Sequence, residues 1–136
     1  MYQYTAQDFL SSASSTAGVT QTFSYDPLTG NMKSGPLGSY QYGENGAGPH
    51  AVTSVQGGSA WHFEYDARGN MRSRNGVALE HDVAGRLVRA GSVAGEKRFA
   101  YGPFGSRVRK CDPQGCTLYL GDGYEKRIPA STGATQ

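Results

Sequence analysis

The sequence has no long apolar run. No stretch approaches the roughly 18 consecutive apolar residues that suggest a membrane-spanning helix, so we expect no membrane span. The start of the chain, MYQYTAQDFL, also lacks a charged segment followed by an apolar block, which predicts that it carries no signal peptide. These absences indicate either an intracellular protein or a piece of a longer product with its own export route.

The sequence also lacks the motifs of common catalytic and metal-binding sites. It contains no phosphate-binding loop, no Gly-x-Ser-x-Gly turn and no His-Glu-x-x-His motif. The histidines His50, His62 and His81 are far apart and lack a metal-ligand spacing. We interpret His62 as a solvent-facing strand residue and His81 as a packing residue. The sequence therefore predicts a protein that is not an enzyme and uses no metal or cofactor.

Charge is low and unevenly distributed. The net charge of +2 is too small to predict a polyanionic partner, but residues 1–60 carry one base and three acids, and residues 61–136 carry twelve bases and eight acids. The basic segment 86–110 fits either a patch for nucleic acid or anionic glycan, or solvated strand faces with basic residues guarding the edges. No nucleic-acid motif accompanies the charge, so we favour the second interpretation and expect no nucleic-acid partner.

What the sequence has is glycine, tyrosine and phenylalanine, with 20, nine and five residues. This composition, with few aliphatic runs, favours an all-β chain with many turns. The stretch WHFEYDARGNMRSR, residues 61–74, shows the pattern most clearly. Trp61, Phe63 and Tyr65 alternate with polar residues and share one face of a strand. Asp66 and Gly69 then form a turn, and a short polar strand returns.

Degraded copies of this hairpin recur along the chain. We therefore predict an array of antiparallel β-hairpins in one curved, continuous sheet over 21–128, after a lead-in at 1–20 with no clear element and before a flexible tail at 129–136. Within the lead-in, 7–13 fits a short helix or a strand. Asn75-Gly76 is a strong two-residue hairpin signal. The predicted turn and register residues are Asp26, Gly30, Asp66, Gly69, Asp82, Gly85 and Gly105, and the packing aromatics are Phe23, Tyr25, Trp61, Phe63, Tyr65, Phe99 and Tyr101.

Asp26, Asp66 and Asp82 each stand at the start of a predicted turn. They fit a catalytic carboxylate pair less well than a turn role, in which the side chain accepts from backbone N–H groups two residues on. The turn role also predicts that Gly69→Val costs more stability than Gly57→Ala, because only Gly69 needs a positive backbone angle.

Cys111 and Cys116 flank the turn Asp112-Pro113-Gln114-Gly115. Across a tight hairpin their β-carbons come within disulfide reach, which suits an exported protein. Two reduced thiols, the default in the cytosol, are the equal alternative.

Four segments resemble the YD repeats of the Rhs family: FSYDPLTGNMKS, FEYDARGNMRSRNG, LEHDVAGRLVRA and FAYGPFGSRVRK. GSYQYGENGAGPHAVTSV and TLYLGDGYEKRI resemble further stretches found among such repeats. The resemblance covers Thr20 to about Ile128. It departs from the pattern at His81, which replaces the tyrosine, and at Gly102, which replaces the aspartate.

The resemblance implies a structural module in a toxin-encapsulating β-shell, as in bacterial Rhs proteins, the C components of Tc toxins and the similar shell of teneurins. It implies a secreted or cell-surface location as part of a larger bacterial protein. The implied partners are neighbouring repeats and an enclosed toxin segment, and the open strand edges also predict self-association. Bacterial members carry a self-cleaving core segment after the repeats; none is visible after Ile128, so no catalytic residue is carried over. The alternative function is a carbohydrate-binding surface module that stacks sugars on the strand aromatics.

Overall fold

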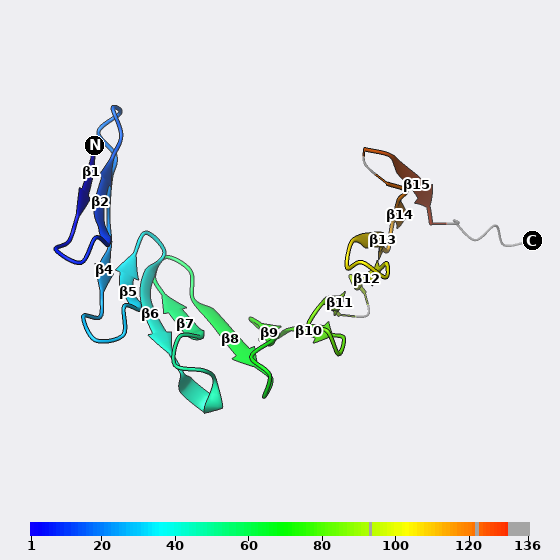
Figure 1. Ribbon diagram of the computed structural model, residues 1–136, viewed down its shortest axis with the longest axis horizontal. Helices are drawn as coiled ribbons and strands as arrows, with labels where there is room; N and C mark the ends of the chain where they lie inside the picture. Colours follow the sequence, from blue (N-terminus) through cyan, green and yellow to red (C-terminus); the bar gives the residue numbers. More distant parts are fainter. Residues whose placement is uncertain (93, 122, 131–136) are drawn as a thin grey trace, which may run out of the picture. The chain divides into compact units, whose positions relative to one another are not determined.

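The computed structural model describes residues 1–92, 94–121 and 123–130, and these residues form an all-β structure of antiparallel strands (Figure 1). The only helical element among them is a single 3-10 turn, η1 (Glu44–Gly46). This confirms the predicted all-β array of antiparallel hairpins.

Fifteen strands lie within the described part of the chain, and strands that follow one another in the sequence pair, except β3 and β4, which belong to different sheets. A three-stranded sheet has the order β1-β2-β3, and a twelve-stranded sheet has the order β15-β14-β13-β12-β11-β10-β9-β8-β7-β6-β5-β4. The strands are β1 (Tyr2–Tyr4), β2 (Leu10–Ser14), β3 (Thr20–Thr22), β4 (Ser24–Tyr25), β5 (Met32–Gly35), β6 (Gly38–Tyr42), β7 (Val52–Gln56), β8 (Trp61–Tyr65), β9 (Met71–Arg74), β10 (Val77–His81), β11 (Leu87–Ala90), β12 (Lys97–Tyr101), β13 (Arg107–Asp112), β14 (Gly115–Tyr119) and β15 (Glu125–Pro129).

The chain divides into two compact units, Met1–Met71 and Arg72–Gln136. The first unit holds the three-stranded sheet and β4 to β8, and the second holds β10 to β15, with β9 at the division. Each unit is described by itself below.

The lead-in, for which the sequence predicted no clear element, is a β-meander. Residues 7–13 form neither a helix nor one strand: residues 5–9 turn, and β2 begins at Leu10. The first segment of the predicted array is divided at Phe23 between β3 and β4, and the Phe23 N–H still donates to the Ser11 carbonyl of β2 over 2.9 Å. Ser24 then pairs with Ser34 of β5, so the chain changes sheets here and the predicted single sheet is in fact two.

At the other end of the array, β15 extends one residue past the predicted limit, to Pro129. Pro129 pairs with Gly115, and Ala130 N–H donates to the Gln114 carbonyl over 2.8 Å. Proline is tolerated here because the edge of a sheet leaves one side of the strand without a ladder partner. Of the predicted tail, residues 131–136 lie outside the described residues.

Very little of the described chain is buried. Val55 is 3% exposed and Thr53 is 2% exposed, both on β7, and they are the only buried residues described. A folded domain of ordinary kind buries a continuous cluster of apolar side chains. The predicted packing aromatics are instead half-buried, as expected for single-layer hairpins that cover one another's edges.

Candidate functional site

The predicted turn aspartates are hydrogen-bonded into their own turns. Asp66 Oδ1 accepts from Arg68 N–H at 2.9 Å and from Asn70 N–H at 2.8 Å. Asp82 Oδ1 makes the same two bonds, to Ala84 at 2.9 Å and Arg86 at 3.0 Å. These carboxylates therefore fix turn geometry, since an Asx side chain satisfies the N–H groups that a tight turn leaves unpaired.

Asp26 closes a turn that is one residue longer. Its Oδ1 accepts from the N–H groups of Leu28 and Thr29 and from the Thr29 hydroxyl. These bonds, led by the Thr29 N–H, hold the pKa of Asp26 below its ordinary value. The Arg86 guanidinium and then its N–H lower the pKa of Asp82. Both groups are stabilised as carboxylates and are poorly suited to carry a proton near neutral pH.

The four predicted turn glycines all adopt positive φ, at 72° to 83°. In the turn at Asp66, Gly69 N–H donates to the Asp66 carbonyl and Asp66 N–H donates to the Asn70 carbonyl. This is a type I turn followed by a left-handed residue, a common three-residue hairpin connection. Gly102, in place of aspartate, keeps both backbone bonds to Gly105 and Ser106 and lacks only the side-chain acceptor.

Sequence reasoning missed two turns of this type in the lead-in. Thr5 N–H donates to the Phe9 carbonyl, and the Thr5 hydroxyl accepts from Phe9 N–H at 3.2 Å, as the aspartates do elsewhere. Asp8 stands in the glycine position with φ 62°. The second turn runs from Ser15 to Gly18. The sequence contained signals for both turns. Thr5 and Ser15 can replace aspartate at the start of a turn, and Asp8 can adopt the left-handed backbone conformation that glycine adopts elsewhere.

A second repeated contact is a tyrosine hydroxyl that donates to the neighbouring strand. Tyr42 donates to the Met32 carbonyl at 2.8 Å, Tyr65 to the Val52 carbonyl at 2.8 Å and Tyr101 to the Leu87 carbonyl at 2.9 Å. Burial raises the pKa of Tyr65; burial and then the neighbouring Tyr40 raise that of Tyr42. The alternation of residues predicted the position of these rings but not the acceptors, because strand pairing had not been assigned.

The rings of the aromatic stripe differ between the two units. In the first unit, Trp61 and Phe63 are parallel within 4°, with centroids 6.5 Å apart, and Phe9 stacks on Tyr25 at 4.9 Å. The remaining stripe residues of that unit, Phe23, Tyr25 and Tyr65, are half-buried.

In the second unit, arginine guanidinium groups lie over three of the aromatic rings. The Arg86 guanidinium lies 5.0 Å from the Tyr101 centroid, and that of Arg107 lies 5.8 Å from Phe99 and 4.9 Å from Tyr119. Arg107 also donates to the Tyr119 hydroxyl at 3.2 Å. These cation–π contacts cover the rings of Phe99, Tyr101 and Tyr119.

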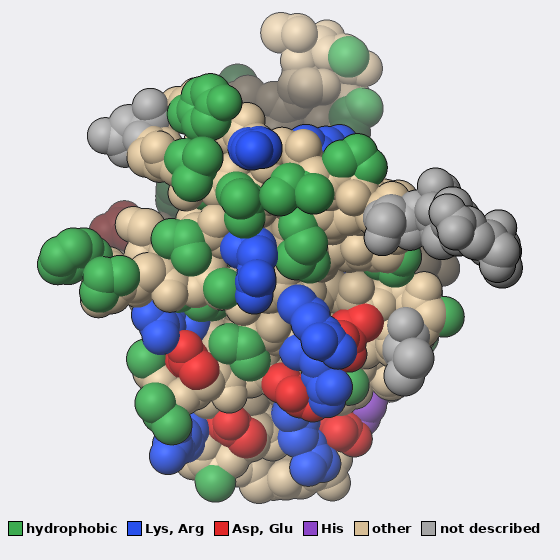
Figure 2. Space-filling model, turned by 90° about the vertical axis from the view of Figure 1, so that its right-hand side faces the viewer, with side chains coloured by type: hydrophobic (Ala, Val, Ile, Leu, Met, Phe, Trp, Pro, Cys, Tyr) green, Lys and Arg blue, Asp and Glu red, His purple; other side chains and the backbone are tan. Residues whose placement is uncertain are grey.

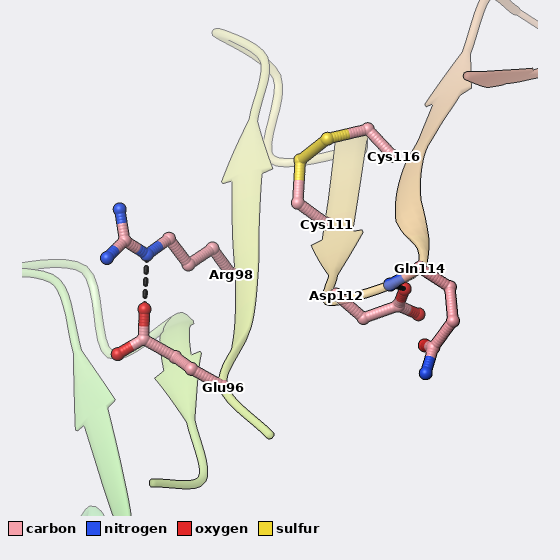
Figure 3. Close-up of a disulfide and its surroundings, with 6 residues drawn as sticks. All are labelled: Glu96, Arg98, Cys111, Asp112, Gln114 and Cys116. Carbon is pink, nitrogen blue, oxygen red and sulfur yellow. Dashed lines mark hydrogen bonds and ion pairs between the residues drawn. A yellow bond between two sulfur atoms is a disulfide. The ribbon is translucent and has the colours of Figure 1, made fainter. Parts of the chain in front are cut away.

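Cys111 and Cys116 form a disulfide across the β13–β14 hairpin (Figure 3). The two residues are direct register partners, and the next pair, Asp112 and Gly115, closes a two-residue turn. Asp112 Oδ1 accepts from Gln114 N–H at 3.0 Å, so this turn uses the same aspartate cap as the others.

An ion-pair row lies beside the disulfide. Arg89 and Arg98 are directly opposite each other on β11 and β12, and like charges in that position repel. Glu96 contacts both arginines. It bonds to Arg98 (Figure 3) and lies 3.3 Å from Arg89, which also pairs with Glu80. The bond from Arg98 is the main reason that the pKa of Glu96 is lowered.

The three histidines lie on different elements: His50 before β7, His62 on β8 and His81 on β10. His50 Nδ1 lies 2.7 Å from Asn31 Oδ1, and Asn31 Nδ2 donates to the Pro49 carbonyl at 2.9 Å. His81 pairs with Leu87 and is half-buried, and His62 is exposed on β8. Residues 1–92, 94–121 and 123–130 contain no group of three or more His, Cys, Asp or Glu side chains that could hold a metal ion.

Two glycines outside the predicted set of turn and register residues hold strands close together, a role that the sequence analysis did not predict. Gly38 and Gly115 each follow a Pro-x turn, with φ 126° and 136°. A Cβ on Gly38 would lie 2.0 Å from the Gln56 carbonyl oxygen, and one on Gly115 would lie 2.1 Å from that of Ile128. The prediction that Gly69→Val costs more than Gly57→Ala did not consider such an approach: a Cβ on Gly57 would lie 2.0 Å from the Leu37 oxygen, whereas one on Gly69 would meet nothing within 4 Å.

Comparison with protein-family models found no match, and a search of curated proteins found no similar sequence. In the described part of the chain, no helix is long and apolar enough to cross a membrane.

Proposed function

We propose that this chain is a non-catalytic structural module, a run of YD-type hairpins that forms part of the wall of an Rhs-type, toxin-encapsulating β-shell. The proposal begins from the resemblance of four segments to the repeats of that family. It places the protein in a larger bacterial product that is secreted or displayed at the cell surface.

The observation that carries the proposal is the repetition of two contacts at successive hairpins. An aspartate or its substitute closes the turn, and a tyrosine just before a turn or loop donates to the preceding strand, as at Tyr65 and Val52. Contacts that recur at equivalent positions are expected when each hairpin is one unit of a linear array. A catalytic site would instead require a unique cluster of reactive groups.

The small buried fraction supports the same proposal. Apart from Val55 and Thr53, the described side chains are half-buried or exposed, so stability must come from neighbour-to-neighbour pairing. A shell wall is one solution, because both faces of its single layer remain accessible while each hairpin is covered along its edges.

Electron microscopy of the product of the whole coding region tests the proposal. We expect a hollow particle whose wall contains these strands in the order described above. A compact particle without an internal cavity, or a product in which this sequence forms an isolated surface domain, would contradict it.

The second candidate function is carbohydrate binding through the aromatic stripe. The parallel rings of Trp61 and Phe63 favour it, because aromatic ring faces suit sugar stacking. A glycan array probed with the protein and with Trp61→Ala separates the two functions. A shell wall predicts the same signals for both proteins, and loss of binding in the variant supports the carbohydrate module.

A further inference from the structure

The second unit presents two parallel rows of side chains on opposite faces of β13, β14 and β15. Directly paired residues in an antiparallel sheet project to the same face. Lys110, Thr117 and Arg127 are register partners and form one row. The other row consists of Arg109, Leu118 and Lys126, which are also register partners and are each adjacent in sequence to a member of the first row.

The two rows carry the same charge and differ in the middle. The Lys110 row places a hydroxyl between two cations, so all three side chains can donate hydrogen bonds. The other row places a leucine there. Strands lie about 4.8 Å apart, so the outer members of each row are about 10 Å apart at the backbone.

The cations of the Lys110 row have no carboxylate within ion-pair distance among the described residues. Phe99 is the register partner of Lys110, and Lys97 and Phe99 project to this face because they alternate with Arg98. Arg107 lies over the Phe99 ring on the same face. The acids of these strands on this face are Asp112, which caps its turn, and Glu125, the partner of Tyr119.

The charge of this unit supports the choice of ligand. Residues 72–136 carry eleven bases and six acids, whereas residues 1–71 carry two bases and five acids. In the view of Figure 2, Lys and Arg side chains lie close together with Asp and Glu side chains interspersed among them. Paired and unpaired cations at this density attract anionic ligands.

We propose that the Lys110 row, with Arg107 beside it, binds a linear anionic polysaccharide across β13 to β15, its sulfate or carboxylate groups accepting from Lys110, Thr117 and Arg127. Single-stranded nucleic acid would need free ring faces on which to stack its bases. The guanidinium group of Arg107 or Arg86 already covers the rings of Phe99, Tyr101 and Tyr119. A polysaccharide bound through its anionic groups needs no such ring.

The disulfide projects to the opposite face and fixes the alignment of this row. Cys111 and Cys116 are adjacent to Lys110 and Thr117 on the same two strands, so the covalent link fixes the register that aligns the row. The proposal is independent of the shell function, since an anionic glycan can bind a shell wall or an isolated module.

Fluorescent heparin, as the sulfated probe, tests the proposal by equilibrium titration of the whole chain at two salt concentrations. Lys110→Gln/Arg127→Gln is the test variant, and Arg109→Gln/Lys126→Gln is the matched control with the same charge change on the same strands. Circular dichroism and thermal melting confirm that both remain folded. We expect the test variant to weaken heparin binding about tenfold and the control less than about threefold. Thr117→Val should weaken it about threefold.

Equal losses in the two double variants would overturn the proposal, because binding would then follow net charge alone. Absence of heparin binding by the natural sequence would also overturn it. A parallel titration with single-stranded DNA of similar length should give weaker binding. Equal or tighter DNA binding with the same dependence on Lys110 and Arg127 would replace the glycan with nucleic acid as the ligand.

Discussion

Removal of one tyrosine hydroxyl provides a sharp test of the repeated contacts, because strand β6 contains its own control. Tyr42 and Tyr40 are two residues apart on this strand and are both half-buried. The Tyr42 hydroxyl donates to the Met32 carbonyl at 2.8 Å, whereas the Tyr40 hydroxyl has no hydrogen-bond partner among the described residues. Tyr42→Phe and Tyr40→Phe therefore delete the same atom with and without its bond.

We expect Tyr42→Phe to lower the free energy of unfolding by about 1 kcal/mol, the net worth of a neutral hydrogen bond. The Met32 carbonyl is only partly buried, so water can replace part of the lost bond. For a unit the size of Met1–Met71, this corresponds to a fall in Tm of roughly 4–8 °C. Tyr40→Phe should change Tm by less than about 2 °C.

Thermal melting followed by circular dichroism at pH 7 measures both variants. Tyr65→Phe should match Tyr42→Phe, because its hydroxyl bonds to Val52 with the same geometry. Equal Tm values for Tyr42→Phe and Tyr40→Phe would refute the argument that these hydroxyls hold neighbouring strands together. A larger loss for Tyr40→Phe would refute it as well.

The remaining predictions concern the turns, the close strand contacts and the disulfide. Stability should fall as pH drops below about 4. Folding lowers the pKa values of Asp26 and Asp82, so their ionised forms stabilise the folded state at pH values above the unfolded pKa, and this stabilisation is lost when the carboxylates bind protons. Asp82→Asn should flatten that fall in an acid titration, and an unchanged profile would count against the turn role. Stability should also fall above about pH 10, since the raised pKa of Tyr42 favours the unfolded, ionised form, and Tyr42→Phe should reduce the slope of an alkaline titration. Gly38→Ala should cost about 3 kcal/mol or more in urea unfolding, because the new Cβ forces β7 away, whereas Gly58→Ala, with open space around it, should cost under about 1 kcal/mol; similar costs would disprove the close approach. The Cys111→Ser/Cys116→Ser variant should lose about 2 kcal/mol, the loop-closure value for so short a loop, and mass spectrometry of the unreduced natural chain should show the loss of two hydrogen atoms. A pair of thiols that alkylates fully without reductant would contradict the disulfide.

The sequence was sufficient for the hairpins and for most of their turns. Period-two aromatics such as Trp61 and Phe63 identify a strand, and Asp66 with Gly69 identifies its turn, because these signals are local and depend on few residues. Asn75-Gly76 predicted a two-residue turn, and both residues adopt positive φ between Arg74 and Val77.

What the sequence did not show depends on contacts between strands. The need for glycine at Gly38 and Gly57 arises from the approach of two backbones that lie far apart in sequence. The acceptor of the Tyr42 hydroxyl and the stacking of Arg107 on Phe99 likewise depend on register. The division between β3 and β4 at Phe23 had no local signal in the sequence, because a strand that changes partners keeps its alternation of side chains.

Interstrand nuclear Overhauser effects in the natural chain test the central claim most directly, namely that successive hairpins pair in one register. We predict backbone proton contacts for Val55 with Trp61, for Arg89 with Arg98 and for Thr117 with Arg127. Contacts confined to the tight turns, such as Arg74 with Val77, together with none of these three, would contradict the account.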